Sequence, residues 1–370
     1  MLGEQDSPLH TRVLARLAGA LRDERSPERR IRLGEEAVTA ARRLGDDATL
    51  AYALGGLCAA QHALANHERR LEVAGELREL ALAIEDRESV GDALTAALLV
   101  HATRNDFAAV RADMAAYAAI AEQLAQPSQA WLSRSLDAMV ALHEGRLEDA
   151  ELLVPAAYEL GRRAQAFESL SAFAVQLFLL RRERGRLEDA AEPLSRAWPW
   201  LAARLSGSAL AALAAGLGAQ ADARRGLEEL APNDFELVPR DNEWLLAAAF
   251  LAETARALGD TARMASLYAE LAPHADWCTA NPPEGSVGSV ARTLGILAAE
   301  LGRQDAAIDH LRRAIEIDTS TGATPWVAYA QVELAALVTP REAAALRGEA
   351  SQRASALGME RLSARLAANR

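Results

Sequence analysis

The chain is poor in cysteine and in aromatic residues, and it has no excess of positive charge. Only Cys58 and Cys278 occur among its 370 residues, and two such distant cysteines predict neither a disulfide framework nor a cysteine-ligated metal site. The seven histidines are scattered, and none forms a pair four residues apart beside a carboxylate, as a zinc site on a helix would need. We therefore expect no metal ion and no cofactor.

The balance of charge argues against binding to nucleic acid. The sequence has 40 Lys and Arg residues against 52 Asp and Glu residues, for a formal net charge of −12. Proteins that bind nucleic acid usually present a basic face to the phosphates. Here arginines are interspersed with glutamates, as in Arg181–Arg184, which is typical of a solvated, ion-paired helix surface. We expect no direct contact with nucleic acid.

Long apolar runs are missing as well. The alanine-rich stretches are interrupted by polar residues, so we expect no membrane-spanning segment and no membrane partner. Residues Met1–His10 are polar and lack the apolar centre that a signal peptide contains. A cytoplasmic location is the default expectation.

No motif of a familiar catalytic chemistry is present. The sequence contains neither a Gly-x-Ser-x-Gly elbow nor a glycine-rich nucleotide loop. Gly285–Ser289 superficially resembles a phosphate-binding turn, but it follows Pro282–Pro283 rather than a strand. We interpret it as a linker into a helix that Ser289 caps. Thr339–Pro340 likewise predicts the start of a C-terminal helix. We expect no catalytic residues.

What the sequence does contain is a repeat. The phrase Gly145–Ala150 returns forty residues later as Gly185–Ala190, and its frame returns again in Gly302–Ala307. Looser copies of the turn lie at Ser26, Asn66, Asn105, Gly218 and Gly259. A period of about 40 residues is typical of a helical hairpin repeated along the chain, because one hairpin cannot bury its apolar face alone.

Small or apolar residues recur at helical spacing after each turn. After each turn comes one such residue, and further mostly apolar residues follow it at four and seven positions. This spacing is typical of the buried stripe of an amphipathic helix. The stripes begin at Ile31, Leu71, Val110, Ala150, Ala190, Ala223, Met264 and Ala307. The sequence therefore predicts an all-α fold, a right-handed α-solenoid of about eight helix-turn-helix units without a sheet. We expect one domain over residues 1–370, with a bend near 201–217 and capping helices in 340–370.

Two sets of residues carry resemblances to known families. The first set is Leu294, Gly295, Gly302, Ala307, Leu311 and Ala314, and this unit resembles the tetratricopeptide repeat. The second set is Ser26–Arg30, Ala41–Asp46, Gln176–Glu183, Pro239–Leu245, Gly288–Arg292 and Gly322–Trp326. Through these segments almost the whole chain resembles the helical-repeat region at the C-terminal side of actinobacterial-type signalling ATPases, among them adenylate-cyclase-linked ATPases and LuxR-family regulators. The chain has neither their phosphate loop nor a cyclase domain, so it is either a fragment of such a regulator or a stand-alone relative.

A set of charged residues marks the candidate site. In a solenoid of this kind the first helix of each hairpin lines the concave side. The repeat frame places there His143, Arg182, Glu183, Glu253, Arg256, Arg292 and Glu300. Glu253 and Arg256 are three residues apart and are spaced to pair with each other. Both signs of charge suit an extended peptide or a zwitterionic small molecule better than a polyanion.

Three functions stay open. The first, which we expect, is a non-catalytic scaffold that binds a protein or peptide segment in the groove, in signalling or transcriptional regulation; the other two are alternatives to it. The second, implied by the resemblance to the regulators, is a sensor that binds a small effector. The third is an enzyme that uses His143 or Arg182 in acid–base chemistry. A homodimer also stays open, because the first helix has an apolar side, with Val13, Leu14, Leu17 and Leu21, that must pack inward, against an upstream domain or against another copy.

Overall fold

The computed structural model describes residues 7–21, 24, 27–197, 205–236, 238 and 240–368. Over these residues the fold is all-α, and the only β-type pairings within them are isolated bridges. In the same ranges, no helix is both long and apolar enough to cross a lipid bilayer. The predicted fold class is confirmed.

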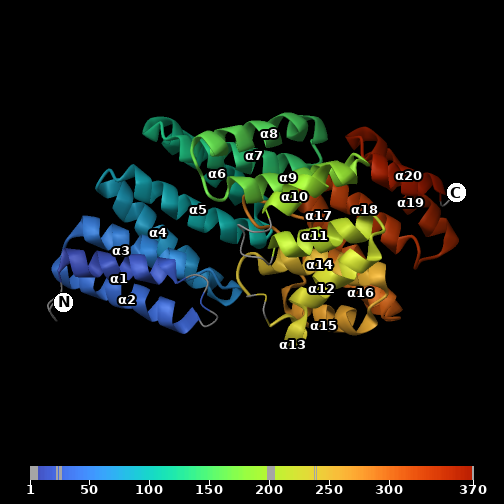
Figure 1. Ribbon diagram of the computed structural model, residues 1–370, viewed down its shortest axis with the longest axis horizontal. Helices are drawn as coiled ribbons and strands as arrows, with labels where there is room; N and C mark the ends of the chain where they lie inside the picture. The colour runs from blue at the N-terminus through green and yellow to red at the C-terminus, as the bar shows by residue number, and fades with distance from the viewer. Residues whose placement is uncertain are drawn as a thin grey trace. The chain divides into compact units, whose positions relative to one another are not determined.

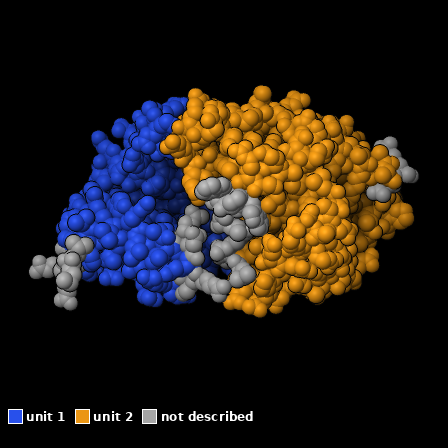
Figure 2. Space-filling view, in the orientation of Figure 1, with its two compact units in different colours: residues 1–101, 107–129, 239–242 blue, residues 102–106, 130–238, 243–370 orange. Residues whose placement is uncertain are grey.

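The residues group into two compact units. Unit 1 comprises residues 1–101, 107–129 and 239–242, and unit 2 comprises residues 102–106, 130–238 and 243–370 (Figure 2). One domain over residues 1–370 stays a prediction. The predicted bend near 201–217 also stays a prediction, since residues 201–204 lie outside the described residues.

Unit 1 is built from stacked helices that share one apolar core. Its elements are α1 (Pro8–Ala20), α2 (Pro27–Leu44), α3 (Asp47–Ala60), η1 (Leu64–Asn66), α4 (His67–Ala83), most of α5 (Arg87–Thr103) and α6 (Phe107–Leu124). Small residues such as Ala37, Ala41 and Ala51 fill the core beside Leu54 and Leu57. On α1, Val13 and Leu17 remain 47% and 38% exposed, so they do not pack inward.

Unit 2 holds the remaining helical hairpins (Figure 1). Its elements are most of α7 (Pro127–Glu144), α8 (Leu147–Arg163), α9 (Ser169–Glu183), η2 (Leu187–Ala190), α10 (Ala191–Ala197), α11 (Leu205–Gly216), α12 (Gln220–Leu230), α13 (Pro232–Phe235), α14 (Trp244–Leu258), α15 (Thr261–Leu271), η4 (Ala272–His274), α16 (Val290–Glu300), α17 (Gln304–Thr321), α18 (Thr324–Leu334), α19 (Pro340–Leu357) and α20 (Glu360–Ala368). The start of α19 is confirmed: Thr339 caps it and Pro340 stands in its first turn.

The predicted turns lie where helices end. Residues with a left-handed backbone follow directly on α7 at Gly145 and end α14 at Gly259. The same conformation occurs at Asn105, Gly185, Gly218 and Gly302. A left-handed residue at this position ends one helix and lets the chain enter the next. Asn66 is the N-cap residue of α4, and Ser26 lies outside the described residues.

The buried stripe follows the prediction except at its first two positions. Val110, Ala150, Ala190, Ala223, Met264 and Ala307 are all buried. Ile31 and Leu71 are only half-buried, and the arginines one position earlier, Arg30 and Arg70, are buried instead. The frame thus shifts by one residue at both positions, and the buried Arg30 donates from Nε to the carbonyl oxygen of Ala60, at the end of α3, over 2.8 Å.

Paired helices approach closely where the tetratricopeptide-like frame has its small residue. A β-carbon built on Gly295 of α16 would lie 2.6 Å from Leu311 Cγ of α17. Leu294, Ala307, Leu311 and Ala314 are fully buried around this contact. The absence of a side chain at residue 295 therefore sets the separation of the two helices.

The inner helices of unit 2 form a closed series. Helices α9, α11, α14, α16 and α18 contact one another in chain order, and α20 returns to contact α9. At this closure Arg184 donates from Nη1 to the carbonyl oxygen of Gly358 over 3.4 Å. A β-carbon on Gly145 would likewise lie 2.7 Å from Pro325 Cγ. Helix α20 thus completes the series of inner helices in unit 2 by its contact with α9.

Residues 278–289, between η4 and α16, form a buried hairpin that leads into the helix, where the sequence predicted a linker. All but Pro282 are buried. The backbone of Asn281 exchanges two hydrogen bonds with Gly285, and Thr279 N donates to the Gly288 carbonyl oxygen. Ser289 is the N-cap residue of α16, as predicted, but its hydroxyl donates to Asp318 instead of capping the helix. These bonds satisfy backbone groups that burial would otherwise leave unpaired.

Candidate binding site

Unit 2 contains a cavity of about 400 Å³ at the meeting point of five helices. Helices α9, α14, α16, α18 and α20 all contribute to its wall. The lining residues are Arg182, Glu253, Arg256, Ala257, Arg292, Ile296, Glu300, Trp326, Tyr329, Glu333, Arg361, Leu362 and Arg365. Charged groups therefore converge on this space from repeats that lie far apart in the sequence.

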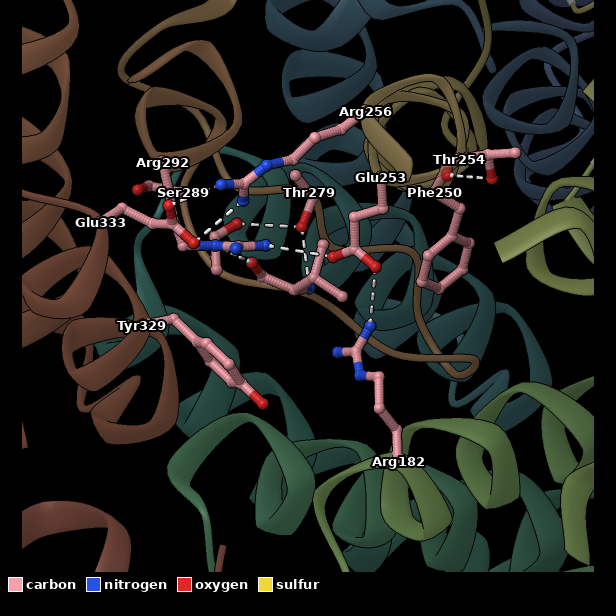
Figure 3. Close-up of polar contacts among 12 residues, drawn as sticks. Arg182, Phe250, Glu253, Thr254, Arg256, Thr279, Ser289, Arg292, Tyr329 and Glu333 are labelled. Atoms are coloured by element: carbon pink, nitrogen blue, oxygen red, sulfur yellow. Dashed lines mark hydrogen bonds and ion pairs between the residues drawn. The ribbon is translucent and has the colours of Figure 1, made fainter. Parts of the chain in front are cut away.

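Glu253 lies at the centre of the first ion-pair cluster. Its Oε2 accepts a hydrogen bond from Arg182 Nη1 over 3.2 Å, and its Oε1 lies 3.7 Å from Arg292 Nη2. Figure 3 shows Arg182 and Arg292 reaching Glu253 from different helices. Burial alone would raise the pKa of Glu253, but the guanidinium groups of Arg182 and Arg292 outweigh it and hold that pKa below its ordinary value.

Glu333 forms the second cluster. It accepts two hydrogen bonds from Arg256, at 2.9 Å each, and its Oε1 also lies 2.9 Å from Arg365 Nη2. Arg256 donates further from Nε to Glu300 over 2.8 Å. The prediction that Arg256 pairs with Glu253 on the same helix is thus wrong. Carboxylates from α16 and α18 offer Arg256 better geometry, including a bidentate pair, than its own neighbour along the helix.

Aromatic side chains surround the buried arginine. Trp326 lies beneath two cations, with the guanidinium carbons of Arg182 and Arg292 at 5.2 and 5.0 Å from its ring centroid. Such contacts stabilise a buried positive charge. Tyr329 donates its hydroxyl hydrogen to Glu183 Oε2 over 2.8 Å, and burial followed by the Glu183 carboxylate raises the pKa of Tyr329.

Two buried donors in the cavity wall have no acceptor within the described part of the chain. They are Nη2 of Arg182 and the indole Nε1 of Trp326. Both side chains are 3% exposed. The Nε and Nη1 atoms of the same arginine are taken by Glu183 and Glu253. A buried donor without an acceptor is uncommon and destabilises the fold.

Five of the seven residues predicted for the groove line this cavity. They are Arg182, Glu253, Arg256, Arg292 and Glu300. Glu183 stands behind them, bonded to Arg182 and Tyr329. His143 lies elsewhere in unit 2: it is buried, and its Nδ1 is 2.7 Å from the hydroxyl oxygen of Ser286 in the hairpin.

The prediction missed the residues that α18 and α20 contribute. Trp326, Tyr329 and Glu333 are spaced three and four residues apart, so they share one face of α18. This spacing could have marked α18 as the first helix of a further hairpin after Gly322. The repeat was followed through its glycine turns, and the turn at Leu337–Thr339 has no glycine. Arg361 and Arg365 show the same four-residue spacing on α20.

Within the part of the chain that the structure describes, acidic and thiol groups do not gather into a metal centre. Across the described ranges, no group of three or more His, Cys, Asp or Glu side chains is arranged to hold a metal ion. Cys58 and Cys278 are free thiols in the two units, and burial raises the pKa of both.

Comparisons with known proteins place the chain in no family. No protein-family model matches the sequence, and no curated protein matches it. Among solved structures, a protein described as "Circular tandem repeat protein with novel repeat topology and enhanced subunit contact surfaces" aligns with 97% of this chain and 96% of its own, at 16% identity and a TM-score of 0.23. At this TM-score and identity the likeness says nothing about the site.

Proposed function

We propose that this chain is a non-catalytic binding protein whose unit 2 cavity receives a small effector molecule. The observation that supports this most directly is the cavity of about 400 Å³ itself. Pockets of roughly 300–1,000 Å³ are the usual size for small ligands. Its wall joins α20 to helices of four different hairpins, so that a bound molecule would touch all of them at once.

An extended peptide in the groove receives less support. The hairpin 278–289 already occupies part of the inner side of unit 2, where Gln176 Nε2 of α9 donates to the carbonyl oxygen of Pro283 over 2.6 Å. His143 is bonded to the same hairpin. Because α20 also closes on α9, the space that remains suits a small molecule, or the last residue of a peptide, better than a long segment.

The charges in the cavity favour binding over acid–base catalysis. Burial would raise the pKa of Glu333, but the hydrogen bonds and charge of Arg256 hold it below its ordinary value, and Glu253 behaves in the same way. A general base works best with a pKa near the operating pH. Carboxylates that are tightly paired and hard to protonate instead fix the arginines in position.

The resemblance to the sensor region of ATPase-linked regulators gives the proposal a biological setting. In that setting the chain acts in the cytoplasm, in signalling or transcriptional regulation, and a catalytic partner domain responds to the bound effector. An effector that bridges α9 and α20 would stabilise the closure of unit 2, because binding to the folded form shifts the equilibrium toward it.

Native mass spectrometry tests the proposal. The purified chain is measured under gentle conditions and again after partial denaturation, together with Ala257→Trp, which fills the cavity from its wall. Ala356→Trp, an exposed alanine on α19, is the matched control. We expect the wild type and the control to release a small molecule that Ala257→Trp does not carry. Equal retention by Ala257→Trp, or no small molecule from cells or added extract, would contradict the proposed function.

A further inference from the structure

The unpartnered donors of the cavity identify a chemical class of ligand. Arg182 Nη2 and Trp326 Nε1 are donors only, so the atom that satisfies them must be an acceptor. Figure 3 shows Nη2 of Arg182 turned away from Glu253, toward the side on which Tyr329 lies. A neutral carbonyl oxygen has lone pairs for two donors, but an anion with several oxygens also meets the positive charge of the lining.

The distribution of charge supports an anion. Five arginines and three glutamates line the cavity, although the chain as a whole has a net charge of −12. Each glutamate is already paired: Glu253 with two arginines, Glu333 with two, and Glu300 with one. Glu183 also pairs with Arg182 from behind the wall. Four carboxylates thus face the five arginines, so the cavity keeps an excess of positive charge.

Arg361 carries part of that excess. It lines the cavity and is exposed, and within the described ranges it makes no ion pair closer than 4 Å, although its charge reaches Glu253. By contrast Arg365, one turn further along α20, is held by Glu333. Arg361 is thus the cation at the cavity that is available to a ligand entering from solvent.

We infer that the cavity binds the anionic group of its ligand, a carboxylate or a phosphate, between Arg182 Nη2, Trp326 Nε1 and Arg361. This inference rests on the proposed function and names the ligand class of the same site. Ile296 and Leu362 supply apolar wall beside it, so a molecule with a small apolar body and one anionic end fits best. The Trp326 ring already lies beneath two cations, and it acts through its N–H rather than as a stacking surface.

The test follows the indole N–H signals of the full chain by NMR during titration at constant ionic strength. Inorganic phosphate and acetate are the two probes, and Trp326→Phe assigns the Trp326 signal among the six indoles. We expect one probe or both to shift that signal, and the stronger response distinguishes a phosphate from a carboxylate ligand. If neither probe moves the Trp326 signal, the inference is wrong.

Two variants measure the contributions of the donors. Trp326→Phe removes one N–H while it keeps an aromatic ring, and Arg361→Gln removes one unpaired charge. We expect calorimetry to show affinity for the responding probe about tenfold weaker in each. Arg312→Gln, an exposed arginine paired with Glu342, is the matched control and should bind as the wild type does. Unchanged affinity in both cavity variants would overturn the inference.

Failure of the inference is distinguishable from failure of the proposed function. A neutral or cationic molecule that the wild type retains and Ala257→Trp loses would contradict the anion site and leave the binding function intact. A chain that retains no molecule and responds to neither probe would contradict both.

Discussion

The Nδ1 atom of His143 lies 2.7 Å from the Ser286 hydroxyl oxygen, and this contact ties helix α7 to the second arm of the buried hairpin 278–289. Gln176 of α9 donates a hydrogen bond to the carbonyl oxygen of Pro283, in the turn of the hairpin. The hairpin is therefore an internal part of unit 2 that sits where an open groove was expected. The cavity lined by Arg182 lies where α14, α16, α18 and α20 meet α9.

Replacing Gly295 tests whether the tetratricopeptide-like frame sets the helix separation. Gly295→Ala places a β-carbon 2.6 Å from Leu311 Cγ and 3.2 Å from its backbone nitrogen, so we expect a loss of about 1–3 kcal/mol in the free energy of unfolding. Gly348 on α19 meets nothing within 4 Å, and Gly348→Ala should instead stabilise the chain by about 0.5–1 kcal/mol. Urea denaturation followed by circular dichroism decides between the two signs; destabilisation of equal size at both positions would contradict this account.

Gly288 is a second position at which only glycine fits. Its φ of 83° is left-handed, and a β-carbon would lie 2.6 Å from the Trp326 β-carbon. Gly302 has a similar φ of 72° but nothing within 4 Å. Gly302→Ala should cost about 1 kcal/mol of stability from the backbone alone, and Gly288→Ala about 3 kcal/mol or more, because the clash adds to the strain. All six tryptophans fall in the residue ranges of unit 2, so tryptophan fluorescence reports its unfolding.

The ion pairs at the cavity are unequal in their effect on stability. Glu253→Gln leaves Arg182 and Arg292, both buried, without their shared carboxylate, so we expect a loss of about 3 kcal/mol. Glu300→Gln, the matched control, removes a half-exposed carboxylate whose partner Arg256 keeps the bidentate pair with Glu333. That change should cost less than about 1 kcal/mol. The same fluorescence-detected urea titration measures both, and equal costs would show that Glu253 is not the central counter-charge.

The helical hairpins could be predicted from the sequence because their signals are local. Turn residues such as Gly145 and Gly259 end a helix through their own backbone, and the buried stripe needs only the residues of one helix. The close contact at Gly295 lies within the tetratricopeptide-like frame, which spans two consecutive helices.

The composition of the site could be predicted only in part, because its pairing is set by distant contacts. Glu253 and Arg256 have the spacing of a helical pair, yet each is bonded to other helices. The closure of α20 on α9 joins Arg184 to Gly358, which are 174 residues apart. Neither segment alone predicts that contact. The hydrogen bond between His143 and the hairpin likewise joins residues that are 143 positions apart.

Two buried carboxyl groups give the stability of unit 2 a dependence on pH. Burial, followed by the charges of Glu243 and Glu168, raises the pKa of Glu284 to about 8. Glu284 is in the hairpin, where its Oε2 accepts a hydrogen bond from Asn281 Nδ2 over 3.1 Å. Burial also raises the pKa of Asp318 to about 7, although Arg292 and Ser289 oppose that shift. In both cases the folded chain holds a proton that the unfolded chain has already released.

Glu284→Gln isolates the larger of these effects. Below the ordinary pKa of 4.5 the Glu284 carboxyl is protonated in both states, and above about 8 it is ionised in both. Between these values only the folded state holds the proton, so the free energy of unfolding of the wild type falls as pH rises. Glutamine stays neutral, and the difference between variant and wild type should grow across this window to the order of 2–4 kcal/mol in favour of the variant. Asp318 is present in both proteins, so its contribution cancels in the difference. Glu188→Gln, which replaces an exposed carboxylate, is the control, and its free energy of unfolding should change with pH as that of the wild type does. If the free energy of unfolding of Glu284→Gln also follows the wild type across this window, the Glu284 carboxyl does not retain a proton in the folded chain.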